Sequence, residues 1–412
     1  MAEQDRVDGV VVVGGVDTHR DTHVGAVVDS TGRLLGSALF RADPAGYGQL
    51  VAWMASWGRV SRVGVEGTGS YGAGLARHLL GTGIDVVEVN RPNRQLRRRQ
   101  GKDDHTDAEA AARAALSGEA AAVPKSGDGP VEWIRMLALT RRSAIKARTQ
   151  AANQIHSVLV SAPEPLKAQL RGMNLKARVR VCARFRPSGE SSVSYAKLAL
   201  RRLARRYQVL DTEIAELNIE IRRLCAKANP ALLAAKAVGP DTAAALLVAA
   251  GDNPERMNSE RSFAALCGVS PVQASSGRTV RHRLSRGGNR QANSALWRIA
   301  TNRMRTDPAT KEYVARRQAE GKKRTEIIRC LKRHIAREVY RLLTDPPPTP
   351  NCAKLRSRRQ QSGITVTEAA RTLGTYPSRI SALELGRDHN HQLATRYQRW
   401  LQTHEPPAPA PT

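Results

Sequence analysis

The chain is poor in acidic residues, in aromatic residues and in long apolar runs. Of its 412 residues, 66 are Lys or Arg, only 37 are Asp or Glu, and the formal net charge is +29. A cationic surplus of this size indicates a polyanionic partner, because Lys and Arg gain free energy at phosphates by releasing counterions. Nucleic acid is the leading candidate, and a membrane surface is the alternative.

Two absences count against a membrane location. No apolar run reaches the roughly 18 residues that a membrane span needs, and the opening "MAEQDRVDG" lacks the basic start and apolar core of a signal peptide. We therefore expect a soluble intracellular protein without a membrane partner. The length is enough for about two to four domains.

Paired cysteines are also missing. The five cysteines and ten histidines are scattered, without the spacing of a zinc site or of a disulfide scaffold. We therefore expect ordinary thiols, and any metal should be held mainly by oxygen ligands. The cysteines are Cys182, Cys225, Cys267, Cys330 and Cys352.

The first 120 or so residues have the pattern of an α/β domain. Residues 9–29 give two apolar, β-branched runs around a polar turn, which predicts two neighbouring strands. A third strand ends at Glu66, a Gly/Ser turn follows, a helix begins in 73–80, and residues 84–89 form another strand.

Residues 129–228 are predicted to be helical, with an interruption between about 178 and 192. Aliphatic and aromatic residues there recur at alternating spacings of four and three, which predicts a coiled-coil seam that packs either within one chain or between chains. The seam residues are Leu203, Tyr207, Leu210, Ile214, Leu217, Ile221 and Leu224.

Residues 237–252 combine a Gly-Pro turn with an alanine-rich helix, which is typical of a helix-hairpin-helix or of a plain helical hairpin. A proline-rich linker occupies 346–351. Beyond it, "TVTEAARTLG" and "YPSRISALELG" have the punctuation of a helix-turn-helix. This unit resembles the Cro/repressor-like class, which implies that Ser378 and Arg379 face the major groove of DNA. A plain helical cap is the alternative.

Four carboxylates lie at predicted strand or helix ends: Asp17, Glu66, Asp104 and Asp107. Converging carboxylates repel one another unless cations neutralise them, and Mg²⁺ prefers such oxygen ligands. Two Mg²⁺ about 3.5–4 Å apart, or Mn²⁺ in their place, suit nuclease or strand-transfer chemistry. The plain alternative is a capped helix N-terminus, and we assign only that role to Asp103 and Glu109.

A dense arginine run precedes this acidic segment. We expect its side chains to hold a nucleic-acid backbone against the carboxylates, although a solvated loop is the alternative. The run consists of Arg91, Arg94, Arg97, Arg98 and Arg99.

Four stretches together carry a family resemblance: "GVDTHRDTHVGAVVD", "GVEGTGSYGAGLARHLL", "NRPNRQLRRRQGKDDHTDAEAAARA" and "LCGVSPVQASSGRTVRHRLSRGGNRQANSAL". In this order, over residues 8–343, the chain resembles the insertion-sequence transposases with a DEDD motif, the IS110 family. The resemblance implies a RuvC-like domain with an RNase H type fold, and it carries the DEDD motif onto the same four carboxylates.

The resemblance also implies a serine that attacks DNA, five residues beyond Pro271. This position is Ser276, with Ser275 as the close alternative. The basic segment around it would contact the scissile phosphates through Arg278, Arg281, Arg283, Arg286 and Asn289. The chain departs from many relatives at Ala292 and Asn293, which puts one local contact in doubt.

We thus expect an N-terminal RuvC-like domain (8–125), a helical coiled-coil region (129–230), a mainly α transposase domain (231–345), the linker (346–351), a helix-turn-helix unit (352–403) and a disordered tail (404–412). The resemblance implies donor and target DNA, a structured bridge RNA, and dimers that assemble into a tetramer, in the nucleoid of a bacterial cytoplasm. A junction-resolving nuclease and a non-catalytic DNA-binding regulator are the alternatives.

Overall fold

The computed structural model describes residues 10–89, 103–275, 277, 282–283, 285, 287–348, 352, 354–386 and 390–404. The chain divides into two compact units, one of residues 1–128 and 250–259 and the other of 129–249 and 260–412. The short segment 250–259 joins the first unit through Asn253, whose side chain accepts from Ser126 N at 3.1 Å and donates to Pro124 O at 3.0 Å. The domain bounds given above remain predictions.

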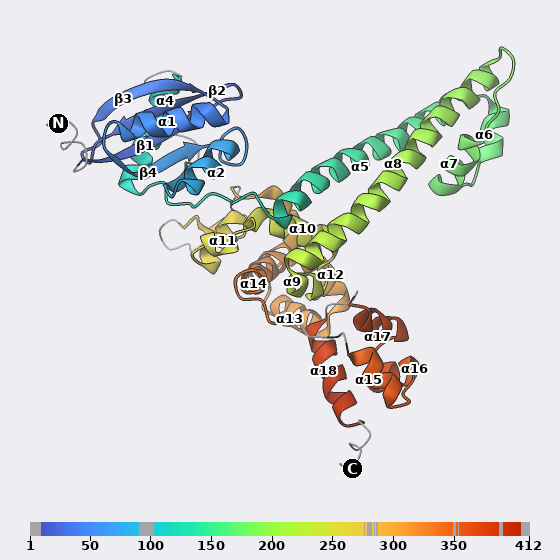
Figure 1. Cartoon of the computed structure of the whole chain (residues 1–412). Helices are drawn as coiled ribbons and strands as arrows, with labels where there is room; N and C mark the ends of the chain where they lie inside the picture. The colour runs from blue at the N-terminus through green and yellow to red at the C-terminus, as the bar shows by residue number, and fades with distance from the viewer. Residues whose placement is uncertain are drawn as a thin grey trace, which may run out of the picture. The chain divides into compact units, whose positions relative to one another are not determined.

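The first unit is built on a five-stranded mixed sheet (Figure 1). Its strands are β1 (Val11–Thr18), β2 (Thr22–Val28), β3 (Leu34–Arg41), β4 (Arg59–Glu66) and β5 (Asp85–Val89). Their order is β3-β2-β1-β4-β5, with antiparallel pairs on the β3 side and parallel pairs from β1 to β5. The predicted α/β domain is confirmed, and this mixed sheet fits the RNase H type fold that the sequence resemblance implies.

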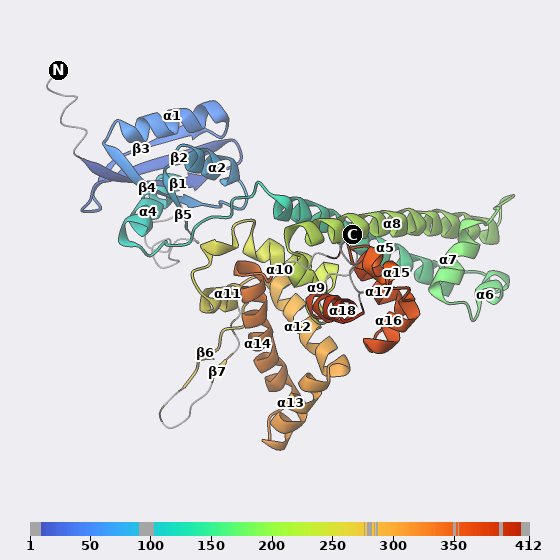
Figure 2. The same ribbon diagram turned by 60° about the horizontal axis from the view of Figure 1, so that its bottom comes forward.

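Helices cover both faces of this sheet, with α1 and α4 on opposite sides (Figure 2). The helices are α1 (Pro44–Ala55), α2 (Ala73–Gly81) and α4 (Asp104–Ser117). Val16 and Val65 face the core shared with α1 and α2, whereas Val13 lies in the core with the alanines of α4. Alternation along the strands therefore divides β1 and β4 into an α1/α2 face and an α4 face.

Two glycines let α4 lie directly on the sheet. A Cβ at Gly15 would meet the backbone nitrogen of Ala112 at 2.1 Å, and one at Gly64 would meet the carbonyl oxygen of Ala111 at 2.6 Å. Side chains at these positions would push the helix away. The close approach brings the first turn of α4 to the end of β1.

The second unit begins with a long helical hairpin. It comprises α5 (Pro130–Ser161), α6 (Glu164–Leu170), α7 (Leu175–Ala183) and α8 (Ser192–Ala228), and α8 packs along α5 (Figure 1). Of the seam residues, Tyr207, Ile214, Ile221 and Leu224 are buried and the other three are half-buried. The buried seam residues are thus covered within this chain, while the coiled coil itself remains a prediction. The predicted interruption is too long, because α7 continues to Ala183 and only residues 184–191 separate it from α8.

Further elements follow α8 in the described part of the chain, up to Thr344. They are α9 (Pro230–Ala234), α10 (Pro240–Ala250), the 3-10 helix Pro254–Arg256, α11 (Glu260–Leu266), β6 (Val272–Gln273), β7 (His282–Arg283), α12 (Arg290–Thr306), α13 (Pro308–Ala319) and α14 (Arg324–Thr344). Pro240 starts α10, as the Gly-Pro turn predicts. The helix-hairpin-helix role of this turn remains a prediction.

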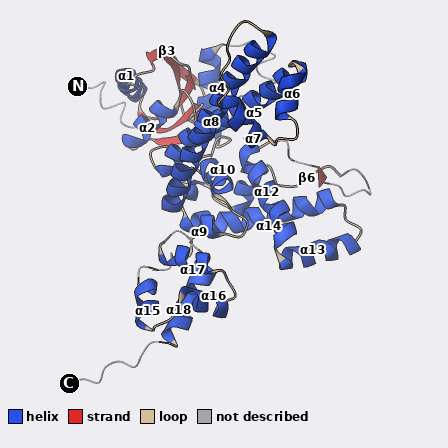
Figure 3. Cartoon of the chain, turned by 90° about the vertical axis from the view of Figure 1, so that its right-hand side faces the viewer, coloured by secondary structure: helices blue, strands red, loops and turns tan. Residues whose placement is uncertain are grey.

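The last helices form a small cluster with its own core (Figure 3). They are α15 (Leu355–Gln361), α16 (Val366–Thr372), α17 (Pro377–Glu384) and α18 (His391–Gln402). Thr365 caps α16 by accepting from Glu368 N at 3.1 Å, and four residues separate α16 from α17. Both helices lie where the sequence predicts them. The helix-turn-helix assignment and its DNA-binding role remain predictions.

Candidate active site

The ends of β1 and β4 place Asp17 and Glu66 side by side. Val16 pairs with Val65 in the parallel register, so the next residue on each strand is a carboxylate. Alternation puts both on the face that carries Gly15 and Gly64, which is the face covered by α4. Thr18 fixes the two strand ends by donating from Oγ1 to the carbonyl oxygen of Glu66 at 2.8 Å.

The first turn of α4 brings the other two predicted carboxylates to this point. Asp104 begins the helix and Asp107 is buried one turn later. Asp103 is the N-cap and accepts from Thr106 N at 3.3 Å, while Glu109 forms an ion pair with Arg113 at 2.6 Å. Asp103 therefore has the helix-start role assigned to it, whereas Glu109 lies in the second turn of α4 and forms an i,i+4 ion pair there.

A histidine completes the cluster. His19 Nε2 lies 3.1 Å from Oδ2 of Asp17 and 3.1 Å from Oδ2 of Asp104. One donor atom from each of these residues lies within 4.8 Å of the other two, a spacing that could hold a metal ion. Sequence reasoning missed His19 because it treated the histidines as dispersed. The signal was its place two residues after Asp17.

The electrostatics of Asp17 fit a cation site. Asp17 is only 6% exposed, and burial raises the pKa of its carboxyl group; Asp104 and Asp107 raise this pKa further, while His19 lowers it. A divalent cation would relieve the repulsion among these carboxylates, and carboxylate oxygens suit Mg²⁺ or Mn²⁺. The cluster is thus a fitting site for the divalent metal that the DEDD motif implies.

Comparison with known proteins agrees with this geometry. Residues 14–162, which include all four carboxylates, match the transposase family defined by the DEDD motif of IS110 elements, and residues 229–315 match the family described as "Transposase IS116/IS110/IS902 family". The chain belongs to the IS110 family of transposases.

Individual proteins similar to this chain come from Streptomyces coelicolor and Mycobacterium paratuberculosis. The chain is 26% identical over 374 residues to the Streptomyces coelicolor mini-circle protein named as the transposase for IS117, which covers 76% of this chain and 89% of that protein. It is 34% identical over 118 residues to the 43.6 kDa protein of insertion element IS110 of the same organism, covering 28% of this chain and 29% of that protein. The 42 kDa protein of IS900 from Mycobacterium paratuberculosis is 28% identical over 153 residues, 36% of this chain and 38% of that protein.

Many of the predicted nucleic-acid residues of this transposase fall outside the described part of the chain. Of the described ones, Ser275 and Arg283 are exposed, as are Ser378 and Arg379 on α17. Those outside the described residues are Arg91, Arg94, Arg97, Arg98, Arg99, Ser276, Arg278, Arg281 and Arg286. Their roles remain predictions.

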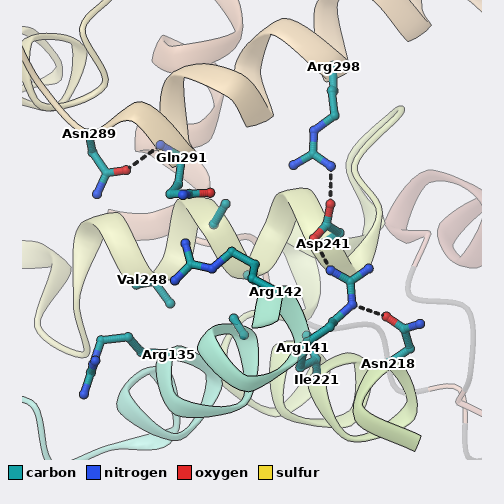
Figure 4. Close-up of a pocket in the computed structure, with 13 residues that line it drawn as sticks. Arg135, Arg141, Arg142, Asn218, Ile221, Asp241, Val248, Asn289, Gln291 and Arg298 are labelled. Carbon is teal, nitrogen blue, oxygen red and sulfur yellow. Dashed lines mark hydrogen bonds and ion pairs between the residues drawn. The ribbon is translucent and has the colours of Figure 1, made fainter. Parts of the chain in front are cut away.

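Asn289 caps a helix and also lines a cationic pocket. Its side chain caps α12 by accepting from Gln291 N at 2.9 Å and from Ala292 N at 3.1 Å. Figure 4 shows it at the edge of a pocket that also contains Arg141, Arg142 and Arg298. Asp241 pairs with both Arg141 and Arg298, so this pocket is partly neutralised from within.

The described residues give two further findings. No helix among them combines the length and the apolar character needed to cross a membrane. None of the five cysteines forms a disulfide bond with another described residue, and burial raises the pKa of the Cys182 thiol to about 11. A protonated, buried thiol of this kind is unreactive, as expected of an ordinary structural cysteine.

Proposed function

We propose that this transposase cuts and rejoins donor and target DNA with a divalent-metal centre held by Asp17, Glu66, Asp104 and Asp107. Two Mg²⁺, or Mn²⁺ in their place, would occupy it. The observation that carries the proposal is the meeting of buried Asp17 on β1 with Asp104 on α4, beside the end of β4. When bound, the ions would polarise the scissile phosphate and stabilise the leaving oxygen.

The protein's own groups divide the remaining work. Asp17 and Glu66 are fixed by the sheet, and Asp104 and Asp107 by the first turn of α4, so the ligand set is held by rigid elements. The hydroxyl oxygen of Ser276, or of Ser275, attacks the phosphorus. A serine–phosphate ester forms, one DNA ester bond breaks, the serine gives up its proton, and the freed DNA hydroxyl gains one. The reverse step rejoins DNA.

Basic side chains would hold the nucleic acid during these steps. The arginines of 91–99 and of 278–286 are proposed to grip phosphates on either side of the break. Family membership supports DNA as substrate, and we extend it to a bridge RNA that chooses sites by base pairing and to dimers that assemble into a tetramer. The low aromatic content, 4%, is consistent with leaving sequence choice to pairing rather than to stacking on protein.

The C-terminal unit supports a second binding function, recognition of duplex DNA. Ser378 and Arg379 lie exposed on α17, which would be the second helix of the proposed helix-turn-helix. We expect Arg379→Ala to weaken duplex binding by about tenfold and to shift its sequence preference. Arg399→Ala, an exposed change on α18, is the matched control. Equal binding by the two variants would argue against this role.

One gel assay tests the catalytic proposal. The full chain is incubated with Mg²⁺, donor DNA and the noncoding RNA transcribed beside its gene, and covalent protein–DNA adducts are resolved. Adducts lost in both Ser276→Ala and Asp17→Asn support the proposal. Free cleaved ends that survive Ser276→Ala would instead indicate a junction-resolving nuclease. Binding without any cleavage by the parent protein would indicate a non-catalytic regulator.

A further inference from the structure

A second cationic pocket lies in the second unit. It shares no lining residue with the pocket of Figure 4. It is lined by α14, by the residues that follow α11 and by Arg283 of β7. Five of its described lining residues are Lys or Arg, and Glu326 is the only acid among them. The five cations are Arg283, Lys322, Arg329, Lys332 and Arg333.

Lys332 is the unusual member of this lining. It is 8% exposed, and its Nζ donates to Oδ1 of Asn293 at 2.7 Å. Asn293 is itself fixed, because its Nδ2 donates to the carbonyl oxygens of Cys267 at 2.8 Å and Gly268 at 3.0 Å. Within the described part of the chain, no carboxylate lies at ion-pair distance from Lys332. Burial lowers the pKa of Lys332, and the positive charge of Arg329 lowers it further.

The acids near the pocket are used elsewhere. Glu326 accepts from the backbone nitrogen of Lys323 at 2.9 Å and so caps α14, and Glu260 pairs with Arg333 at 3.1 Å and with Arg337 at 2.9 Å. A buried ammonium group with one amide partner is costly unless an anion offsets its charge. Arg283, Lys322 and Arg329 form a cationic rim around the pocket. An anion from solvent would meet this rim first and could then reach Lys332.

We propose that this pocket binds a phosphodiester group of nucleic acid, with Lys332 as its buried anchor and Arg329 and Arg283 at its rim. The inference rests on the proposed function, since it supplies a binding site for that enzyme's nucleic acid. DNA and RNA present the same phosphodiester chemistry, and the experiment distinguishes them. Asn293 orients the lysine, because its amide group is itself held by the carbonyl oxygens of Cys267 and Gly268.

The test measures binding of fluorescein-labelled duplex DNA and of labelled single-stranded RNA to the full chain, by anisotropy in EDTA so that no strand is cut. Lys332→Met should weaken binding of at least one probe by about tenfold and lower the log–log salt slope by about one. Lys311→Met, an exposed lysine on α13, is the matched control and should bind as the parent does. The probe that loses affinity identifies the nucleic acid held.

Arg329→Gln keeps the test decisive if Lys332→Met fails to fold, because Arg329 is exposed at the rim. It should also weaken the same probe, by a few fold, with an unchanged melting curve. Parent-like affinity and salt slope in the folded variants, with both probes, would overturn the inference. Failure of the proposed function would be a separate result. In that case Lys332→Met would still weaken binding, but DNA cleavage would not depend on Asp17.

Discussion

Nε2 of His19 lies 3.1 Å from Oδ2 of Asp104, so a histidine just after β1 contacts the carboxylate that begins α4. Because Asp17 is at the same distance from this nitrogen, His19 is placed to serve as a nitrogen ligand between two oxygen ligands. We expect His19→Ala to weaken Mn²⁺ binding by about tenfold and to remove a directly bound nitrogen from the pulsed electron paramagnetic resonance spectrum of the Mn²⁺ form. An unchanged spectrum would exclude His19 as a ligand.

Asp17 should destabilise the protein when no metal is bound. Its folded-state pKa is raised, so the folded protein holds a proton more tightly than the unfolded chain, and stability falls as the pH rises through that pKa. In EDTA at neutral pH, Asp17→Asn should therefore melt at a higher temperature than the parent, and the difference should shrink as the pH falls. Mg²⁺ should raise the melting temperature of the parent only. A lower melting temperature for Asp17→Asn in EDTA would contradict this account.

Gly15 should be essential for the position of α4. In Gly15→Ala the new Cβ would overlap the backbone of Ala108 and Ala112, so the helix must shift and the free energy of unfolding should fall by about 1–3 kcal/mol or more, with loss of metal binding. Gly48→Ala on α1 is the control. A Cβ there meets no atom within 4 Å, and a glycine-to-alanine change inside a helix stabilises by about 0.5–1 kcal/mol. Denaturant unfolding measures the stability of the two variants, and metal titration measures their metal binding. Equal effects of Gly15→Ala and Gly48→Ala would contradict the prediction.

The C-terminal unit depends on one buried ion pair. Arg359 Nε donates to Glu384 at 2.7 Å, their side chains are 8% and 3% exposed, and the hydroxyl group of Tyr397 donates to the same carboxylate at 2.6 Å. Glu384→Gln should destabilise this unit by about 3–5 kcal/mol, because the arginine loses its counter-charge. Tyr397→Phe, which removes one hydrogen bond, should cost about 1 kcal/mol. Hydrogen exchange over residues 355–402 reports both, and parent-like exchange in Glu384→Gln would contradict the prediction.

The sequence predicted the elements whose pattern is local. The β-branched runs of β1, β2, β4 and β5 and the capped start of α4 were found where expected. By contrast, β3 and α1 were not predicted, and the mostly half-buried or exposed residues of β3 explain why its run gives a weak strand signal. Periodicity identified the seam of α8 but left its partner open, since the same apolar stripe can pack against either chain.

Contacts between distant segments could not be predicted from one sequence. Gly15 and Gly64 carry no side chain, so nothing in their neighbourhood reveals that α4 packs on them. His19 and Asp104 meet only after the sheet and helix form. Lys332 and Asn293 come from different helices, and each is an ordinary residue in its own stretch.

The central claim is that Asp104 and Asp17 belong to one catalytic metal centre, whereas neighbouring Asp103 only caps a helix. The most direct test compares Asp104→Asn with Asp103→Ser, which keeps a capping hydroxyl, for Mn²⁺ binding and for covalent adduct formation on donor DNA. Asp104→Asn should lose both metal binding and adduct formation, while Asp103→Ser should keep them near parent levels. Equal behaviour of the two folded variants would contradict the central claim.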